Sequence, residues 1–290
     1  MSLGLKLGKK APLVLLSSVL FAGLYIPQST SVVDAKAANL TPTYEVKFML
    51  DDDILNSDLT IQSDVQDAFD LPAKAQKIAV EYFDTSDKQL DSEGWNVRFR
   101  KKEDKDNFEM TYKKRYSISN GDIDAALTLA NQQGFDASDT NYEAEVDWGY
   151  SKQTLSLSND KKSKATTSGA TLPADSKALS LLVDNLPGKL KKWKDGSSWG
   201  EKQLKASRAY GPVMASKYEG TWNGIDVDVE IWPIRNASGT GTEPVIEISF
   251  KTDDYNTAAT DRQQLMNYLK QEGWLVPQDS LKTQLVLDRY

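Results

Sequence analysis

The sequence predicts an α+β fold in which antiparallel strands close into a barrel, with helices outside and charged side chains inside. Three observations lead to this prediction. Several short segments alternate strictly between apolar and polar residues, as strands with one apolar face do. Segments with apolar residues three and four positions apart lie between them, which is typical of amphipathic helices. The polar strand faces carry doubled like charges at positions i and i+2, which is unusual for a face in water.

The expected elements follow in chain order. The predicted strands span residues 41–50, 77–85, 95–100, 108–115, 142–148, 213–224, 225–234, 244–252 and 281–290. The predicted helices span residues 56–72, 119–135, 176–193 and 259–273, and the third is interrupted near Pro187. Residues 151–175 are polar and rich in Lys, Ser and Thr, so we expect a loop there. This loop and the following helix, within 151–205, would join two halves at about 43–150 and 206–290.

Residues 1–37 have the three regions of a secretory signal peptide. Lysines at positions 6, 9 and 10 precede an apolar run, and an Ala-x-Ala cleavage site ends at Ala37. We therefore expect a barrel domain of residues 38–290 that is periplasmic or secreted and keeps no stable membrane anchor. The alternative interpretation is an uncleaved anchor, for which the apolar run is short.

The composition excludes several kinds of chemistry. The chain has no cysteine and no histidine, so disulfides, thiolate sites, histidine-ligated zinc and a Ser-His-Asp triad are all absent. Without residues 1–37, which hold four lysines and one aspartate, the formal net charge changes from −7 to −10. Nucleic acid is therefore a poor candidate for a partner.

The charged strand faces combine carboxylates with cations. Glu45 and Lys47 share one face, opposite Val46, and Arg98 and Arg100 share another. For any single strand, an open sheet with its polar face in water is an adequate explanation. For the whole set, a barrel with the charged faces inside fits better, because buried charges need partners or a ligand. Carboxylates suit Mg²⁺ or Mn²⁺, and the cations suit phosphate oxygens, so the two together indicate a metal-bound polyphosphate.

The order of these motifs resembles the CYTH family, also called triphosphate tunnel metalloenzymes. "TYEVKF" matches the end of the family's first strand, "EYFDTSD" its second-strand turn, and "GWNVRFR" its G-x-x-(L/V)-R-x-R strand. "MTYK" resembles the strand paired with it, "NYEAEV" the R-x-E-x-E strand, and "IDVDVEI" and "VIEISF" the later acidic strands. The resemblance implies an eight-stranded antiparallel barrel whose tunnel holds a triphosphate, with Arg98, Arg100 and Lys113 as phosphate ligands.

The sequence departs from the family pattern at three positions. Thr43 replaces a glutamate, Asn141 an arginine, and Ser249 stands at a second acidic position. The loss of a carboxylate from a metal pair weakens metal binding. A non-catalytic exported barrel that binds an anionic ligand or a metal is therefore the alternative function. A lipocalin-like carrier is more distant, since its barrel interior would be apolar.

The leading prediction is a metal-dependent phosphohydrolase that acts on a triphosphate or polyphosphate group with Mg²⁺ or Mn²⁺. The predicted phosphate ligands are Lys47, Arg98, Arg100, Lys113, Arg208 and Lys217. The predicted metal ligands are Glu45, Glu143, Glu145, Asp228, Glu230 and Glu247, and the first three also receive the catalytic role. One ion would orient the phosphates and another would activate water.

Overall fold

The computed structural model describes residues 1, 37–194, 198–279 and 282–290. The strands are β1 (Thr43–Leu50), β2 (Gln76–Asp84), β3 (Trp95–Lys102), β4 (Asn107–Ile118), β5 (Glu143–Trp148), β6 (Gln153–Lys164), β7 (Arg208–Trp222), β8 (Ile225–Arg235), β9 (Thr242–Thr252) and β10 (Leu275–Val276). The helices are η1 (Asp52–Ile54), α1 (Ser63–Ala68), α2 (Gln89–Ser92), α3 (Ile123–Gln132), α4 (Asp175–Asp184), α5 (Gly188–Lys191), α6 (Trp199–Lys205), α7 (Tyr255–Gln271) and α8 (Lys282–Arg289).

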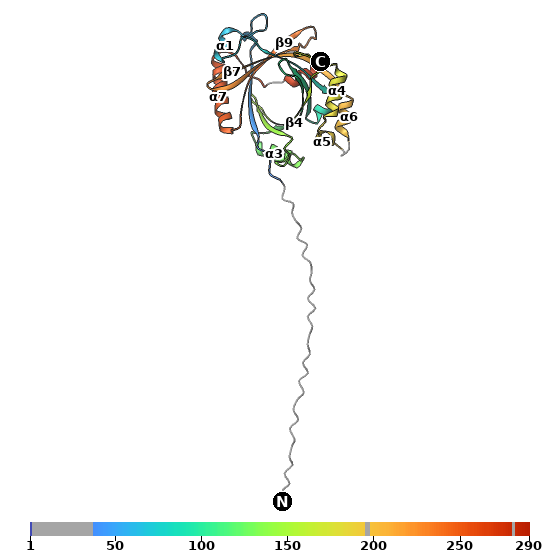
Figure 1. The fold of residues 1–290 in the computed structure, drawn as a ribbon. Helices are drawn as coiled ribbons and strands as arrows, with labels where there is room; N and C mark the ends of the chain where they lie inside the picture. The colour runs from blue at the N-terminus through green and yellow to red at the C-terminus, as the bar shows by residue number, and fades with distance from the viewer. Residues whose placement is uncertain (2–36, 195–197, 280–281) are drawn as a thin grey trace. The chain divides into compact units, whose positions relative to one another are not determined.

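Strands β1 to β9 form a closed barrel (Figure 1). Their order around the ring is β1, β5, β6, β4, β3, β2, β7, β8 and β9, and β9 pairs with β1 to close it. The two-residue strand β10 extends the sheet beside the end of β1. The prediction of a closed barrel with flanking helices is confirmed, but its strand number of eight is wrong.

The barrel is mixed, because β1 and β5 run parallel while the other neighbours run antiparallel. The extra strand is β6, which pairs with both β4 and β5. Residues 153–164 therefore form a barrel strand, where the sequence predicts a loop. Leu155 and Leu157 are fully buried and alternate with serines, so the period-two pattern is present but its polar positions resemble those of a loop.

The apolar strand faces point outward and are covered by helices, as predicted. Trp95 of β3 is fully buried against Phe135 and Trp193. The Tyr112 hydroxyl, on β4, donates a 2.6 Å hydrogen bond to the Leu182 carbonyl of α4. Figure 1 shows α4, α5 and α6 beside one wall of the barrel and α7 beside another. The main hydrophobic core thus lies between the barrel and its helices, which leaves much of the interior to polar side chains.

Helix α8 forms a second core on the inner side of the barrel. Its residues Val286 and Leu287 are buried against Val80 of β2, Ala215 of β7 and their neighbours. Val80 and Ala215 also line the interior cavity, so α8 occupies part of the lumen. The predicted final strand 281–290 is therefore wrong where it is described. These apolar residues fill the lumen as one side of a helix.

The domain boundaries remain a prediction at the N-terminus. Residues 37–290 form one compact unit. The predicted signal peptide lies outside the described residues, apart from its two end positions, so its cleavage is untested. No helix in the described part of the chain combines the length and apolar character that crossing a membrane requires.

Candidate functional site: a charged cavity inside the barrel

The barrel encloses a cavity of about 590 Å³ lined mainly by polar and charged side chains. All nine barrel strands contribute to the described lining, and each of them except β2 contributes at least one charged residue. Strand β2 contributes Ile78, Val80 and Tyr82, and β6 contributes Thr154, Ser158 and Asp160. The lining holds ten acidic and ten basic residues. Because the acidic and basic residues of the lining are equal in number, the cavity has no excess positive charge to neutralise an anion with several negative charges. Such an anion would therefore need to bring cations with it.

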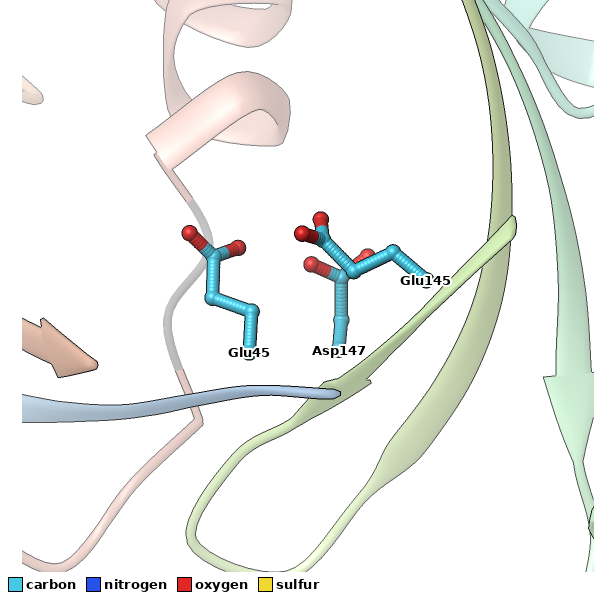
Figure 2. Close-up of side chains that lie close together, drawn as sticks. All are labelled: Glu45, Glu145 and Asp147. Atoms are coloured by element: carbon cyan, nitrogen blue, oxygen red, sulfur yellow. The ribbon is translucent and has the colours of Figure 1, made fainter. Parts of the chain in front are cut away.

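Three carboxylates form the acidic cluster, defined as Glu45 of β1 with Glu145 and Asp147 of β5. One oxygen from each lies within 4.8 Å of the others, and Figure 2 shows the three carboxylates converging. The parallel pairing of β1 with β5 brings them together, because Glu45 stands directly opposite Asp147. In the same register Glu145 stands opposite Thr43, so β5 supplies a carboxylate beside the position where β1 lacks one. The Thr43 hydroxyl instead donates to the Ala144 carbonyl at 3.4 Å.

Lysines neutralise the acidic cluster. The Lys47 ammonium lies 2.7 Å from Glu45 and 2.7 Å from Asp147. Lys251 of β9 pairs with Glu145 and lies 3.5 Å from Glu45, and Lys113 of β4 lies 3.8 Å from Glu145. Each carboxylate of the cluster therefore has at least one ammonium partner.

These ion pairs outweigh the cost of burial. Burial alone would raise the pKa of Asp147, but Lys47, Lys113 and Arg115 hold it well below its ordinary value. Burial would likewise raise the pKa of Glu45, yet Lys47 and Lys251 lower it. Burial tends to lower the pKa of Lys47, and the facing carboxylates raise it well above the usual value. All three groups therefore remain charged at neutral pH.

The basic wall is the part of the cavity formed by Arg98, Arg100 and Lys102 of β3 with Lys113 and Arg115 of β4. Arg100 forms an ion pair with Glu109, whereas Arg98 donates to the Thr111 hydroxyl at 3.2 Å. The Arg98 Nε is buried and has no hydrogen-bond partner among the residues that the structure describes. Among the described residues, Arg98, Lys102 and Arg115 have no carboxylate within ion-pair distance. A buried guanidinium with an unused donor is a ready site for an anion.

A second carboxylate pair lies on the β8 and β9 side of the cavity. Glu230 and Glu247 stand directly opposite each other in these two strands. The Lys282 ammonium, from α8, lies 2.7 Å from each of them. Nearby, Lys217 of β7 pairs with Asp228 at 3.0 Å and with Glu219 at 2.8 Å.

Most of the predicted site residues line this one cavity. They are Glu45, Lys47, Arg98, Arg100, Lys113, Glu143, Glu145, Lys217, Asp228, Glu230 and Glu247. Glu143 lies at the exposed end of β5 and is outside the acidic cluster.

Arg208 is the exception among the predicted ligands. It is exposed, its guanidinium lies 3.6 Å from the centre of the Tyr210 ring, and it donates to the Tyr290 and Ala209 carbonyls. Asn141 also lies outside the barrel interior, in a groove beside Lys189, whereas Thr43 and Ser249 line the cavity. Only two of the three departures from the family pattern therefore concern the cavity.

Nine charged residues of the described cavity lining are not among the predicted site residues: Asp91, Lys102, Arg115, Asp147, Lys152, Asp160, Lys251, Asp279 and Lys282. Asp147, Arg115 and Lys251 each continue the period-two series of a predicted strand, so the signal was present in the alternation. Lys102 follows Arg100 in the same way. Lys282 had no sequence signal, because its position depends on where α8 packs.

The sequence matches no known protein-family profile and no protein in the curated set. Solved structures are similar over most of their length. A candidate adenylyl cyclase from Hippeastrum, described as having a dominant triphosphatase activity, is 13% identical, with 85% of this chain and 99% of that chain covered and a TM-score of 0.43. A candidate adenylate cyclase from Bacillus halodurans is 16% identical, with 82% and 94% covered and a TM-score of 0.44. A Pyrococcus horikoshii protein is 11% identical, with 86% and 99% covered and a TM-score of 0.41.

The fold of this chain is defined by its own strand pairing. A closed ring of strands with helices outside and charges inside is the architecture that the resemblance to the CYTH family implies. The ninth strand and the parallel β1–β5 pair are the differences from the expected barrel.

Proposed function

We propose that this chain is an exported, metal-dependent phosphohydrolase that acts on a triphosphate or polyphosphate group held in the barrel cavity. The observation that carries the proposal is the presence of two complementary sites in one cavity. The acidic cluster offers oxygen ligands, and the basic wall offers three cations, Arg98, Lys102 and Arg115, that have no carboxylate partner among the described residues. A phosphate chain that brings its own divalent cation matches both sites and the balanced charge of the lining.

The basic wall would bind the phosphates. Arg98 is the main candidate, because its side chain is partly buried, faces the cavity and has a free Nε donor. Arg115 and Lys102 lie on the same wall and are also without carboxylate partners in the described residues. Arg100 is less available, since Glu109 already pairs with it. Arg98 and Arg100 stand two residues apart on β3, and repulsion from Arg98, followed by burial, lowers the pKa of Arg100.

The acidic cluster fits a hard divalent cation. Glu45, Glu145 and Asp147 supply three carboxylates within 4.8 Å, and Mg²⁺ and Mn²⁺ prefer such oxygen ligands. When bound, such an ion would polarise a phosphoryl oxygen and lower the pKa of a coordinated water. Lys47 and Lys251 now contact the same carboxylates, so one of these contacts must lengthen to admit the ion. The side chains of the chain itself would bind and orient the phosphates, and the barrel wall would limit the access of water.

The alternative is an exported barrel that binds a phosphorylated ligand or a metal without catalysis. The ion pairs of Lys47 favour it, because they satisfy both Glu45 and Asp147 without any metal. In that case the basic wall would still bind an anion, and the acidic cluster would serve only to balance the charge of the lysines.

Export is proposed on the pattern of residues 1–37 alone. The mature chain would carry a net charge of −10, which favours small phosphorylated ligands over nucleic acid as partners. The location would be the periplasm or the extracellular space.

One assay distinguishes the two functions. Residues 38–290 are purified, and phosphate release from tripolyphosphate and from nucleoside triphosphates is measured with Mg²⁺ or Mn²⁺. Turnover that disappears with chelator and in D147N supports the enzyme. No turnover with any substrate, together with measurable tripolyphosphate binding, would establish the non-catalytic barrel instead.

A further inference from the structure

The Glu230–Glu247 pair is a site where the fold places two negative charges face to face. The two residues are direct partners in the antiparallel β8–β9 register, and both point into the cavity. Like charges at such positions repel each other, and burial increases the cost. The Glu247 side chain is 7% exposed and that of Glu230 25% exposed, so a cation is needed between them.

Lys282 provides that cation from a different part of the chain. Its ammonium is 2.7 Å from a carboxylate oxygen of each glutamate and 5.0 Å from the centre of the Trp232 ring. The Trp232 indole also donates to Glu230 at 2.8 Å. Burial would raise the pKa of Glu230, but Lys282 lowers it to about 2. The Lys282 ammonium thus contacts two carboxylates on neighbouring strands at once. A metal ion bound between the same two carboxylates would make contacts of the same kind.

The bridge leaves part of the pair unused. The second carboxylate oxygen of Glu247 is buried and has no hydrogen-bond partner within the described part of the chain. A buried oxygen without a partner is costly, and a divalent cation with its bound water offers more contacts than one ammonium does. Lys282 also differs from Lys47, which is fixed in the same strand as Glu45. It belongs to the short helix α8, which is not one of the strands that form the ring.

We propose that the Glu230–Glu247 pair is a cation site with two mutually exclusive occupants, the Lys282 ammonium and a divalent metal ion. Helix α8 would thereby set the number of metal ions that the cavity holds. The proposal concerns regulation of the same cavity and rests on the proposed function. With α8 in place, the acidic cluster takes one ion. With Lys282 withdrawn, the cavity takes a second ion between β8 and β9.

The test counts Mn²⁺ ions bound per chain of residues 38–290 by equilibrium dialysis, with free Mn²⁺ measured by electron paramagnetic resonance. The variant K282M removes the ammonium but keeps much of the apolar stem. The matched control K102M removes a positive charge from the same cavity at a residue that forms no ion pair with a carboxylate in the described ranges. We expect K282M to bind one more Mn²⁺ than the wild type, and K102M to bind the wild-type number. The double variant K282M/E247Q should return to the wild-type number.

The difference in bound Mn²⁺ between K282M and the wild type tests this inference. The number of Mn²⁺ ions that the wild type binds tests the acidic cluster. A wild type that binds no Mn²⁺, beside a K282M chain that binds one, would refute the metal site of the proposed function and support the exchange. An equal number in folded K282M and wild type would overturn the exchange. If K282M does not fold, the variant E247Q is measured instead. Binding of as many Mn²⁺ ions as the wild type binds would support the proposal, and binding of one Mn²⁺ fewer would overturn it.

Discussion

The replacement K47M should destabilise the protein in a way that depends strongly on pH. Lys47 forms two 2.7 Å ion pairs, so its loss leaves Glu45 and Asp147 facing each other at the barrel wall. Breaking a buried pair by removing one partner costs about 3–5 kcal/mol. The three side chains remain 13–20% exposed and Lys251 still contacts Glu45, so we expect about 3 kcal/mol at pH 8.

The sign of the pH effect follows from the pKa of Asp147. In the wild type this pKa is lowered, so the carboxylate stabilises the fold above its ordinary value of 3.8 and the stabilisation is lost as pH falls. In K47M burial would dominate and raise the pKa, so the ionised carboxylate would destabilise the fold at higher pH. Below the ordinary value both states are protonated and this penalty disappears. The gap between wild type and variant should therefore shrink from pH 8 to pH 4.

Urea unfolding followed by tryptophan fluorescence at pH 8, 6 and 4 measures this gap. The control is K102M, which removes a lysine of the same cavity that has no ion pair with a described residue and should cost less than about 1 kcal/mol. Equal stability of K47M and wild type at pH 8 would refute the role of the two ion pairs. A large gap that is the same at all three pH values would show that lost packing is responsible.

Three further predictions concern single side chains. R98M should weaken the binding of tripolyphosphate about 10- to 100-fold by titration calorimetry, because a charge-assisted hydrogen bond is lost, whereas R208M, outside the cavity, should bind as the wild type does. E81Q should become more stable relative to the wild type as pH rises from 4.5 to 8, because burial and then Asp175 raise the pKa of Glu81 to about 8. A difference in the free energy of unfolding, measured with urea, that does not change with pH would contradict this. Y112F should lower the free energy of unfolding by about 1–2 kcal/mol, because the buried Leu182 carbonyl loses its donor; an unchanged urea midpoint would count against this bond.

The sequence could predict which side chains point into the cavity, because a strand alternates its faces at every residue. Glu45, Arg98 and Glu247 were placed correctly on this basis, although they come from strands far apart in the chain. The same rule also predicts Asp147 and Lys251. Asp147 stands two residues after Glu145, and Lys251 stands two residues after Ser249, so each lies on the inward face of its strand.

The sequence could not predict how the strands would close. The parallel β1–β5 pair joins residues about a hundred positions apart, and it decides that Glu45 meets Asp147. Strand β6 could not be predicted, because serine is common both in loops and on the polar faces of strands. Arg208 was misplaced because β7 is long and its first residue lies beyond the cavity, at the end of the pairing with β2.

The position of α8 has a consequence for the order in which bonds of a long substrate could be broken. Because Val286 and Leu287 fill part of the lumen against β2, β7 and β8, α8 narrows the passage that a linear polyphosphate, the proposed substrate, would need to thread through the barrel. A substrate that cannot pass α8 would enter, and its product would leave, by the same mouth. Such a narrowed lumen would favour cleavage near the terminus of a chain over cleavage in its middle. It also favours short substrates, whose second end remains outside or fits within the cavity.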